Sequence, residues 1–158
     1  MKQSKLPWLI FSLEKGYYAI NSAVISSIVE FPHKLTGLHN VPDYICGLMK
    51  YREKVIPILD LRKLLDIHYA ENNCIMEHDR NQDRIIVIEN NQMQIGVIVD
   101  AVNAVDVIST LDDQNGILSL LQINYIANVG RGKEIEELIL MINDNELFHL
   151  LHQHVIIS

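Results

Sequence analysis

Seven histidines are the first candidates for chemistry in this 158-residue chain, because imidazole nitrogens bind zinc. His149 and His152 are spaced i, i+3 near the C-terminus, and His154 follows, so the first two would share one face of a short helix. A zinc site needs three or four ligands, however, and no cysteine or carboxylate cluster adjoins these residues. We therefore expect no metal site, and we expect the remaining histidines to be exposed: His33, His39, His68 and His78.

Residues for covalent or acid–base catalysis do not form any recognised arrangement. The chain has no Gly-x-Ser-x-Gly motif, no phosphate-binding glycine loop and no cysteine in a familiar context with histidine. The paired acids at 112–113 and 136–137 fall in expected turns, where carboxylates are ordinarily solvated. Cys46 lies in an apolar run and is expected to be buried, and with Cys74 it is too few for a disulfide framework. We expect no catalytic residues, no cofactor and no enzymatic activity.

Arg52 is the residue whose type and place point to a functional role. It lies within the charged segment 50–54, between two apolar runs. A planar guanidinium binds a carboxylate through two parallel hydrogen bonds, a geometry that lysine does not provide. Two interpretations stay open. Arg52 is either an exposed cation of little energetic value, or a residue that fixes this segment against a neighbouring carboxylate or docks a partner protein.

The elements that must position Arg52 form a clear local pattern. Apolar runs at 45–49 and 55–59 flank the charged segment 50–54, which predicts two strands joined by a tight hairpin. Pro57 lacks a backbone N–H, so the second strand should lie at a sheet edge or carry a bulge there. Asp60 precedes a leucine-rich segment at 61–65, which predicts an N-cap followed by a short helix.

The spacing of five residues within this segment is specific: Gly47, Arg52, Pro57, Asp60 and Leu61. It resembles the CheW-like family of chemotaxis coupling proteins. The family pattern has Gly, two apolar or variable positions, Asn-Leu-Arg-Gly and a variable residue, followed by apolar-apolar-Pro-apolar-apolar-Asp-Leu. Further matches follow downstream at Gly96-x-x-Val99-Asp100-x-Val102, at Tyr125-Ile126-x-x-Val129 and in an expected final strand at 137–143. The resemblance covers most of the chain.

Four positions near Arg52 depart from the family pattern. Glu53 replaces the glycine after the arginine, which should cost about 1 kcal/mol if that position keeps a positive φ. Lys50 and Tyr51 replace Asn-Leu, which makes the surface beside Arg52 more basic and more aromatic. Ser27 lies where many family members carry an acidic residue, so Arg52 could lack the partner that is usual in the family.

Many short apolar runs separated by Gly, Asn and Asp turns predict an all-β barrel or sandwich. Hairpin turns are expected at Lys15-Gly16 and Asn90-Asn91, because glycine and asparagine tolerate positive φ. The resemblance implies a more specific fold of two intertwined five-stranded SH3-like β-barrel lobes with short helices. We expect one domain over 1–158, with a first lobe at about 20–68, a linker at 69–83, and a second lobe at about 84–151 that includes the N-terminal strand.

Charge and hydropathy limit the partners. The formal net charge is −7 and no basic cluster is visible, which argues against binding of nucleic acid. The apolar runs are short, so we expect no insertion into a membrane, and without a signal-peptide pattern we expect a cytoplasmic protein.

The resemblance implies a non-enzymatic adaptor that couples chemoreceptors to a histidine kinase at membrane-associated receptor arrays. Its partners would be the cytoplasmic tip of the chemoreceptor and the regulatory domain of the kinase. The candidate contacts are Arg52 and five apolar residues, although valine and isoleucine are more often buried: Val29, Val41, Ile45, Val99 and Val102. Two alternatives stay open. One is a diverged CheW-like scaffold for another kinase or sensory pathway, and the other is a small β-barrel ligand-binding protein or enzyme, which a deep polar pocket would favour.

Overall fold

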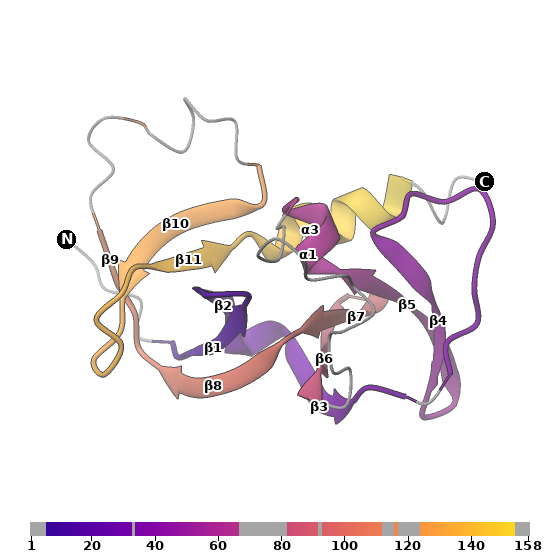
Figure 1. Cartoon of the computed structure of the whole chain (residues 1–158), viewed down its shortest axis with the longest axis horizontal. Helices are drawn as coiled ribbons and strands as arrows, with labels where there is room; N and C mark the ends of the chain where they lie inside the picture. Colours follow the sequence, from indigo (N-terminus) through magenta and orange to yellow (C-terminus); the bar gives the residue numbers. More distant parts are fainter. Residues whose placement is uncertain are drawn as a thin grey trace. The chain divides into compact units, whose positions relative to one another are not determined.

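The computed structural model describes residues 6–32, 34–66, 82–91, 93–111, 116 and 124–153. The chain divides into two compact units, one formed by Ile25–Ala101 and the other by Met1–Val24 together with Val102–Ser158. Each unit is built on a β-sheet, and the described helices are short (Figure 1). The predicted all-β, two-lobed SH3-like fold is confirmed. None of the described helices is long and apolar enough to cross a membrane.

The unit Ile25–Ala101 contains a five-stranded sheet in the order β3-β6-β7-β5-β4. Its elements are β3 (Ile25–Glu30), β4 (Ile45–Tyr51), β5 (Lys54–Asp60), α1 (Leu61–Leu64), β6 (Arg84–Asn90) and β7 (Met93–Val99). Strands β4 and β5 form the predicted hairpin, β6 and β7 form a second hairpin, and β5 runs parallel to β7. A 2.6 Å hydrogen bond between the hydroxyls of Ser27 on β3 and Tyr51 on β4 joins the two edge strands, so the sheet closes on itself.

The core of this unit is made of aliphatic side chains from four strands, with Tyr51: Met49, Ile56, Ile58, Ile85, Val87 and Ile98. Gly96 pairs with Ile58 in the parallel ladder. A Cβ at Gly96 would come within 2.5 Å of Ile58 Cδ1 and 2.7 Å of Ile85 Cγ2. Only the absence of a side chain at Gly96 leaves room for these two neighbours.

The other unit contains a six-stranded sheet in the order β8-β1-β2-β11-β10-β9. Its elements are β1 (Trp8–Leu13), β2 (Gly16–Asn21), the 3-10 helix η1 (Ser22–Val24), β8 (Ala101–Asp106), β9 (Ser109–Thr110), β10 (Ile126–Arg131), β11 (Ile139–Ile142) and α3 (Asp144–Leu151). A cluster of buried side chains lies against this sheet: Ile10, Ala19, Ile108, Ile139 and Met141. The sheet has six strands where five were expected. The additional strand is β9, which has only two residues and pairs with β10.

The division of the chain differs from the predicted one. We expected a second lobe that starts at about residue 84, but β6 and β7 belong to the same sheet as β3, β4 and β5. The reason is that β6 pairs with β3 and β7 pairs in parallel with β5, and both pairings join segments far apart in sequence. Most of the predicted linker, at 69–81, lies outside the described residues.

Two turns differ in detail from their predicted positions. The pairing of Leu13 with Gly16 makes Glu14 and Lys15 the turn between β1 and β2, and Glu14 has the positive φ of 52° that we expected at a glycine. In the second hairpin Asn91 has φ of 51°, so the expected tolerance of asparagine is used.

The strand with Pro57 is internal in the sheet order, but its ladder with β7 begins only at Ile58, so Pro57 has no missing donor in that ladder.

Candidate interaction site at the hairpin between β4 and β5

The hairpin between β4 and β5 ends in a two-residue turn. Tyr51 pairs with Lys54, which leaves Arg52 and Glu53 as the turn residues. Arg52 has φ of 56°, and Glu53 does not have a positive φ. Positive φ at the first of two central residues is the arrangement of a type II′ turn. Glu53 therefore avoids the cost of about 1 kcal/mol that a positive φ would carry, because the register places the positive φ one residue earlier, on Arg52.

The side chain of Arg52 is exposed and lies against an aromatic ring. Its Cζ is 5.0 Å from the centroid of the Tyr51 ring, within the range of a cation–π contact. Within the described residues, no carboxylate forms an ion pair with Arg52. Lys50, Lys54 and Glu53 are exposed beside it. The turn thus presents a guanidinium that is oriented by Tyr51 and open to an external carboxylate.

Tyr51 connects this turn to the opposite edge of the sheet. The residue is buried, and its hydroxyl lies 3.4 Å from Ser26 Oγ and 2.6 Å from Ser27 Oγ. Hydrogen bonding by Ser26 and Ser27 lowers the pKa of Tyr51, because a hydroxyl that donates to the phenolate stabilises the charged form. Ser27, which we expected to leave Arg52 without its usual acidic partner, hydrogen-bonds the tyrosine on which Arg52 stacks.

The predicted apolar anchors occupy different environments. Val29 and Val41 are half-buried in the unit Ile25–Ala101, and Val102 is half-buried in the other unit. The proposal of Ile45 and Val99 as surface anchors is corrected by the structure. Ile45 is only 4% exposed and Val99 is fully buried, so neither side chain is available to a partner protein. Both valine and isoleucine here fill the interior because their strands are covered on the face to which they point.

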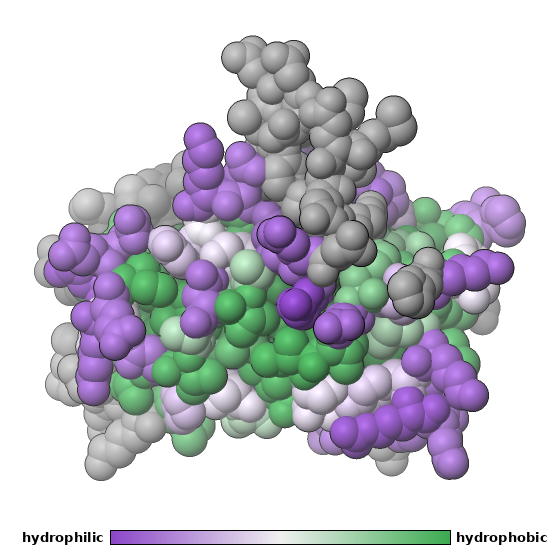
Figure 2. All heavy atoms as spheres, turned by 60° about the horizontal axis from the view of Figure 1, so that its bottom comes forward, coloured by the Kyte–Doolittle hydropathy of each residue, from purple (hydrophilic) through white to green (hydrophobic). Residues whose placement is uncertain are grey.

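Sequence reasoning missed the apolar residues that are exposed. Figure 2 shows hydrophobic residues at the surface of the face it presents, with hydrophilic residues around them. The large apolar residues that the described part of the chain exposes are Leu6, Ile28, Val55, Val105, Leu111 and Leu138. Val55 is 65% exposed and follows Lys54 directly, so it lies two residues beyond the turn that carries Arg52. Ile28 is 42% exposed and follows Ser27 on β3. Alternation along β3 was the available signal for Ile28, whereas the continuous apolar run of β5 gave no such signal for Val55.

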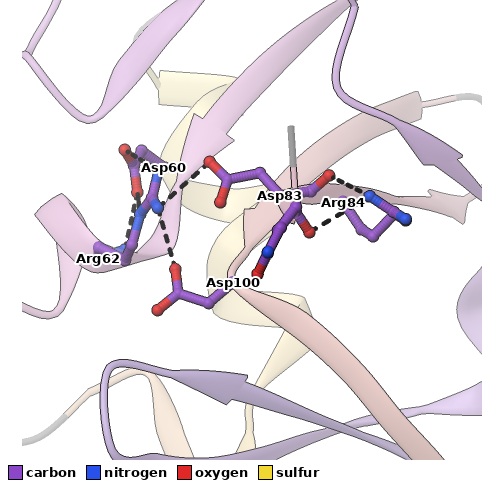
Figure 3. A network of polar contacts seen from close by, with 6 residues as sticks. Asp60, Arg62, Asp83, Arg84 and Asp100 are labelled. Atoms are coloured by element: carbon purple, nitrogen blue, oxygen red, sulfur yellow. Dashed lines mark hydrogen bonds and ion pairs between the residues drawn. The ribbon is translucent and has the colours of Figure 1, made fainter. Parts of the chain in front are cut away.

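Arg62 is a second arginine that sequence reasoning missed. It follows the N-cap Asp60 by two residues, and it is 5% exposed. Its Nε donates to Asp60 Oδ1 at 2.9 Å and its Nη2 donates to Asp60 Oδ2 at 3.2 Å. The two residues thus form a bidentate ion pair (Figure 3). Its Nη1 donates to Asp100 Oδ1 at 2.9 Å and to Asp83 Oδ2 at 3.4 Å. Asp60, Asp83 and Asp100 therefore surround one guanidinium.

This cluster joins the ends of three neighbouring strands. Asp60 ends β5, Asp83 precedes β6 and Asp100 follows β7. Because β5 and β7 are parallel and β6 is antiparallel to β7, these three residues meet at one edge of the sheet. Asp60 also accepts from the backbone N–H of Arg62 at 3.0 Å, which confirms the predicted helix cap. The two aspartates of the family pattern, Asp60 and Asp100, are thus both bound by Arg62, which joins the ends of their strands.

The candidate zinc ligands do not come together in the described part of the chain. There, no three His, Cys, Asp or Glu residues are placed to hold a metal ion. His39, His149 and His152 are exposed as predicted, and His149 lies 3.1 Å from the side-chain amide of Gln153. The other four histidines lie outside the described residues.

Comparison with known proteins shows which family and which proteins this chain is similar to. The family model of the CheW-like domain matches residues 7–152. The chemotaxis protein CheW of Bacillus subtilis (strain 168) is 33% identical over 97 residues, which are 61% of this chain and 57% of that protein. The chemotaxis protein CheW of Klebsiella aerogenes is 31% identical over 107 residues, which are 68% of this chain and 58% of that protein. The matched stretches thus span less than two thirds of the length of either relative.

A solved structure extends the likeness over the whole fold. The crystal structure of the scaffolding protein TtCheW from Thermoanaerobacter tengcongensis superposes with a TM-score of 0.72 and covers 99% of this chain and 96% of that chain. Its sequence identity is 22%, so this likeness concerns the fold alone.

Proposed function

Because this chain belongs to the CheW-like domain family, we propose that it is a non-enzymatic adaptor that couples chemoreceptors to a histidine kinase in chemotaxis signalling. The curated relatives are chemotaxis proteins, which supports this class of function. The observation that carries the proposal is the placement of Arg52. Its guanidinium is exposed at a turn, stacked on Tyr51, and has no ion pair within the described residues.

The chemistry of this turn fits a protein partner with an acidic surface. The turn carries three cations, Lys50, Arg52 and Lys54, and one acid, Glu53. Its local charge is therefore positive, opposite in sign to the net charge of −7 of the chain. Val55 adds an exposed apolar side chain beside these charges. Interfaces commonly combine an apolar anchor with arginine, and a surface arginine that is already oriented by an aromatic ring loses less freedom on binding. We propose that this turn binds the regulatory domain of the kinase.

The half-buried valines are the remaining proposed contacts. Val29 and Val41 belong to the same unit as Arg52, and Val102 belongs to the other unit. The cytoplasmic tip of a chemoreceptor is the proposed partner of these apolar residues. The adaptor would work in the cytoplasm, beside the membrane-associated receptor array, without itself inserting into the membrane.

Capture of the purified partners tests the proposal. The Arg52→Glu variant should lose most binding to the kinase regulatory domain, because it places a carboxylate where a guanidinium is required, and its thermal stability should stay nearly unchanged. The matched control is Lys63→Glu, which makes the same change of charge on an exposed residue of α1, at the opposite end of β5. Binding of the Arg52→Glu variant at the level of the unchanged protein would overturn the role of Arg52.

The altered turn supports one second candidate. Lys50, Tyr51 and Glu53 differ from the family pattern at the place where Arg52 meets a partner. A diverged scaffold that serves another kinase or sensory pathway would account for these changes. Capture with the regulatory domains of several kinases from the same cell separates the two candidates, because a diverged scaffold would retain a kinase outside the chemotaxis pathway in preference to the chemotaxis kinase.

A further inference from the structure

The unit that lacks Arg52 contains a pocket of its own. It has a volume of about 430 Å³ and is lined by Val107, Ser109, Arg131, Gly132 and Lys133. These residues come from the segment that leads into β9 and from the end of β10 with the turn that follows it. The volume lies within the range of pockets that hold small molecules.

The backbone around this pocket is fixed by close packing. Arg131 pairs with Ser109 in the ladder between β10 and β9, so the side chains of these two residues extend from adjacent backbone positions. Gly130 allows this approach, since a Cβ there would overlap Ile108 Cγ2 and lie 2.9 Å from the carbonyl oxygen of Ser109. The positions of Ser109 and Arg131 therefore follow from the pairing of β9 with β10.

One carboxylate beneath the pocket is already engaged by the backbone. Asp106 Oδ1 accepts from Val107 N at 2.7 Å, and Asp106 Oδ2 accepts from Lys133 N at 2.9 Å. Both oxygens thus hold the segment before β9 to the turn after β10. Within the described residues, no ion pair involves the side chain of Arg131 or Lys133. Two cations consequently line the pocket of a chain whose net charge is −7.

We propose that this pocket binds a small organic acid, whose carboxylates would contact Arg131 and Lys133 while its carbon skeleton lies against Val107. Carboxylates match a guanidinium and an ammonium because hydrogen bonds between charged groups are stronger than neutral ones. The apolar wall and the volume favour a ligand with carbon atoms over a bare inorganic anion. The site is independent of the proposed adaptor function, and its failure would leave that function untouched.

The test is a titration of the full isotope-labelled chain with succinate, followed by NMR of the backbone amides, with inorganic phosphate and sodium chloride as separate arms. Succinate should shift the amides of Ser109, Gly132 and Lys133 to saturation, at a lower concentration than phosphate, whereas sodium chloride should give no saturation. The double variant Arg131→Gln with Lys133→Gln should weaken succinate binding at least about tenfold.

Lys15→Gln is the matched control, because Lys15 is an exposed cation of the same unit at a different turn. It should bind succinate like the unchanged chain. Three results would each overturn the proposal. These are a succinate response without saturation, a response that the double variant leaves unchanged, and tighter binding of phosphate than of succinate.

Discussion

Arg62 Nη1 donates a hydrogen bond to Asp100 Oδ1 at 2.9 Å, although 38 positions separate the two residues in the chain. The same guanidinium holds Asp60 and Asp83, so one side chain joins the ends of β5, β6 and β7. The burial of all these groups except part of Asp100 makes the cluster sensitive to the loss of its cation.

Replacing Arg62 should destabilise the protein strongly. Arg62→Ala removes the guanidinium that two buried carboxylates and a partly buried one share, and removal of one partner from a buried ion pair costs about 3–5 kcal/mol. The free energy of unfolding from urea denaturation measures this loss. Lys63→Ala changes the exposed neighbour on α1 and should stay within about 0.5 kcal/mol of the unchanged protein. A loss below about 1 kcal/mol for Arg62→Ala would show that the cluster contributes little.

The positive φ of Arg52 should reverse the usual order of alanine and glycine. Both Arg52→Gly and Arg52→Ala remove the contact with Tyr51, so their difference reports the backbone. Glycine adopts φ near 56° without a steric penalty, and we expect Arg52→Gly to be more stable than Arg52→Ala by about 1 kcal/mol. At Lys54, a strand residue without positive φ, the alanine variant should be the more stable one. Equal stability of the two Arg52 variants would contradict the turn geometry.

Tyr51 should make stability depend on pH in the alkaline range. Hydrogen bonding by Ser26 and Ser27 lowers its folded pKa below 10, so the folded state favours the phenolate more than the unfolded state does. This contribution is complete above the unfolded pKa near 10 and is lost as the pH falls through the folded pKa. The stability of the unchanged protein relative to Tyr51→Phe should therefore rise from pH 8 to about pH 10.5. A constant difference across this range would contradict the assignment.

Gly47 should tolerate no side chain. Its φ is 150°, and a Cβ would overlap the carbonyl oxygen of Thr36, which accepts a hydrogen bond from Leu48 N at 2.7 Å. We expect Gly47→Ala to lower the free energy of unfolding by about 1–3 kcal/mol. Gly37→Ala is the control, because a Cβ at Gly37 meets no atom within 4 Å. If both variants unfold at the same urea concentration, the close approach of Thr36 does not constrain this strand.

The chain sequence by itself determined the features that depend on neighbouring residues. The hairpin around Arg52 follows from two apolar runs and a charged turn, and Asp60 caps the next helix because its carboxylate reaches a backbone N–H two residues away. The motif spacing was enough to identify the family and its all-β fold. The exact turn conformation was less accessible, because it depends on which residues pair, and the observed register gives the positive φ to Arg52 and not to Glu53.

Only the tertiary structure decided which distant segments meet. The parallel pairing of β5 with β7 places residues 84–99 in the same sheet as the hairpin of Arg52. It also places Asp60 and Asp100 next to Arg62. It also decided that Ile45 and Val99 are buried while Val55 is exposed, although all three are similar side chains in similar apolar runs. The physical reason is that pairing and burial depend on contacts between residues far apart in the chain, whose partners are not encoded in the type of any single residue.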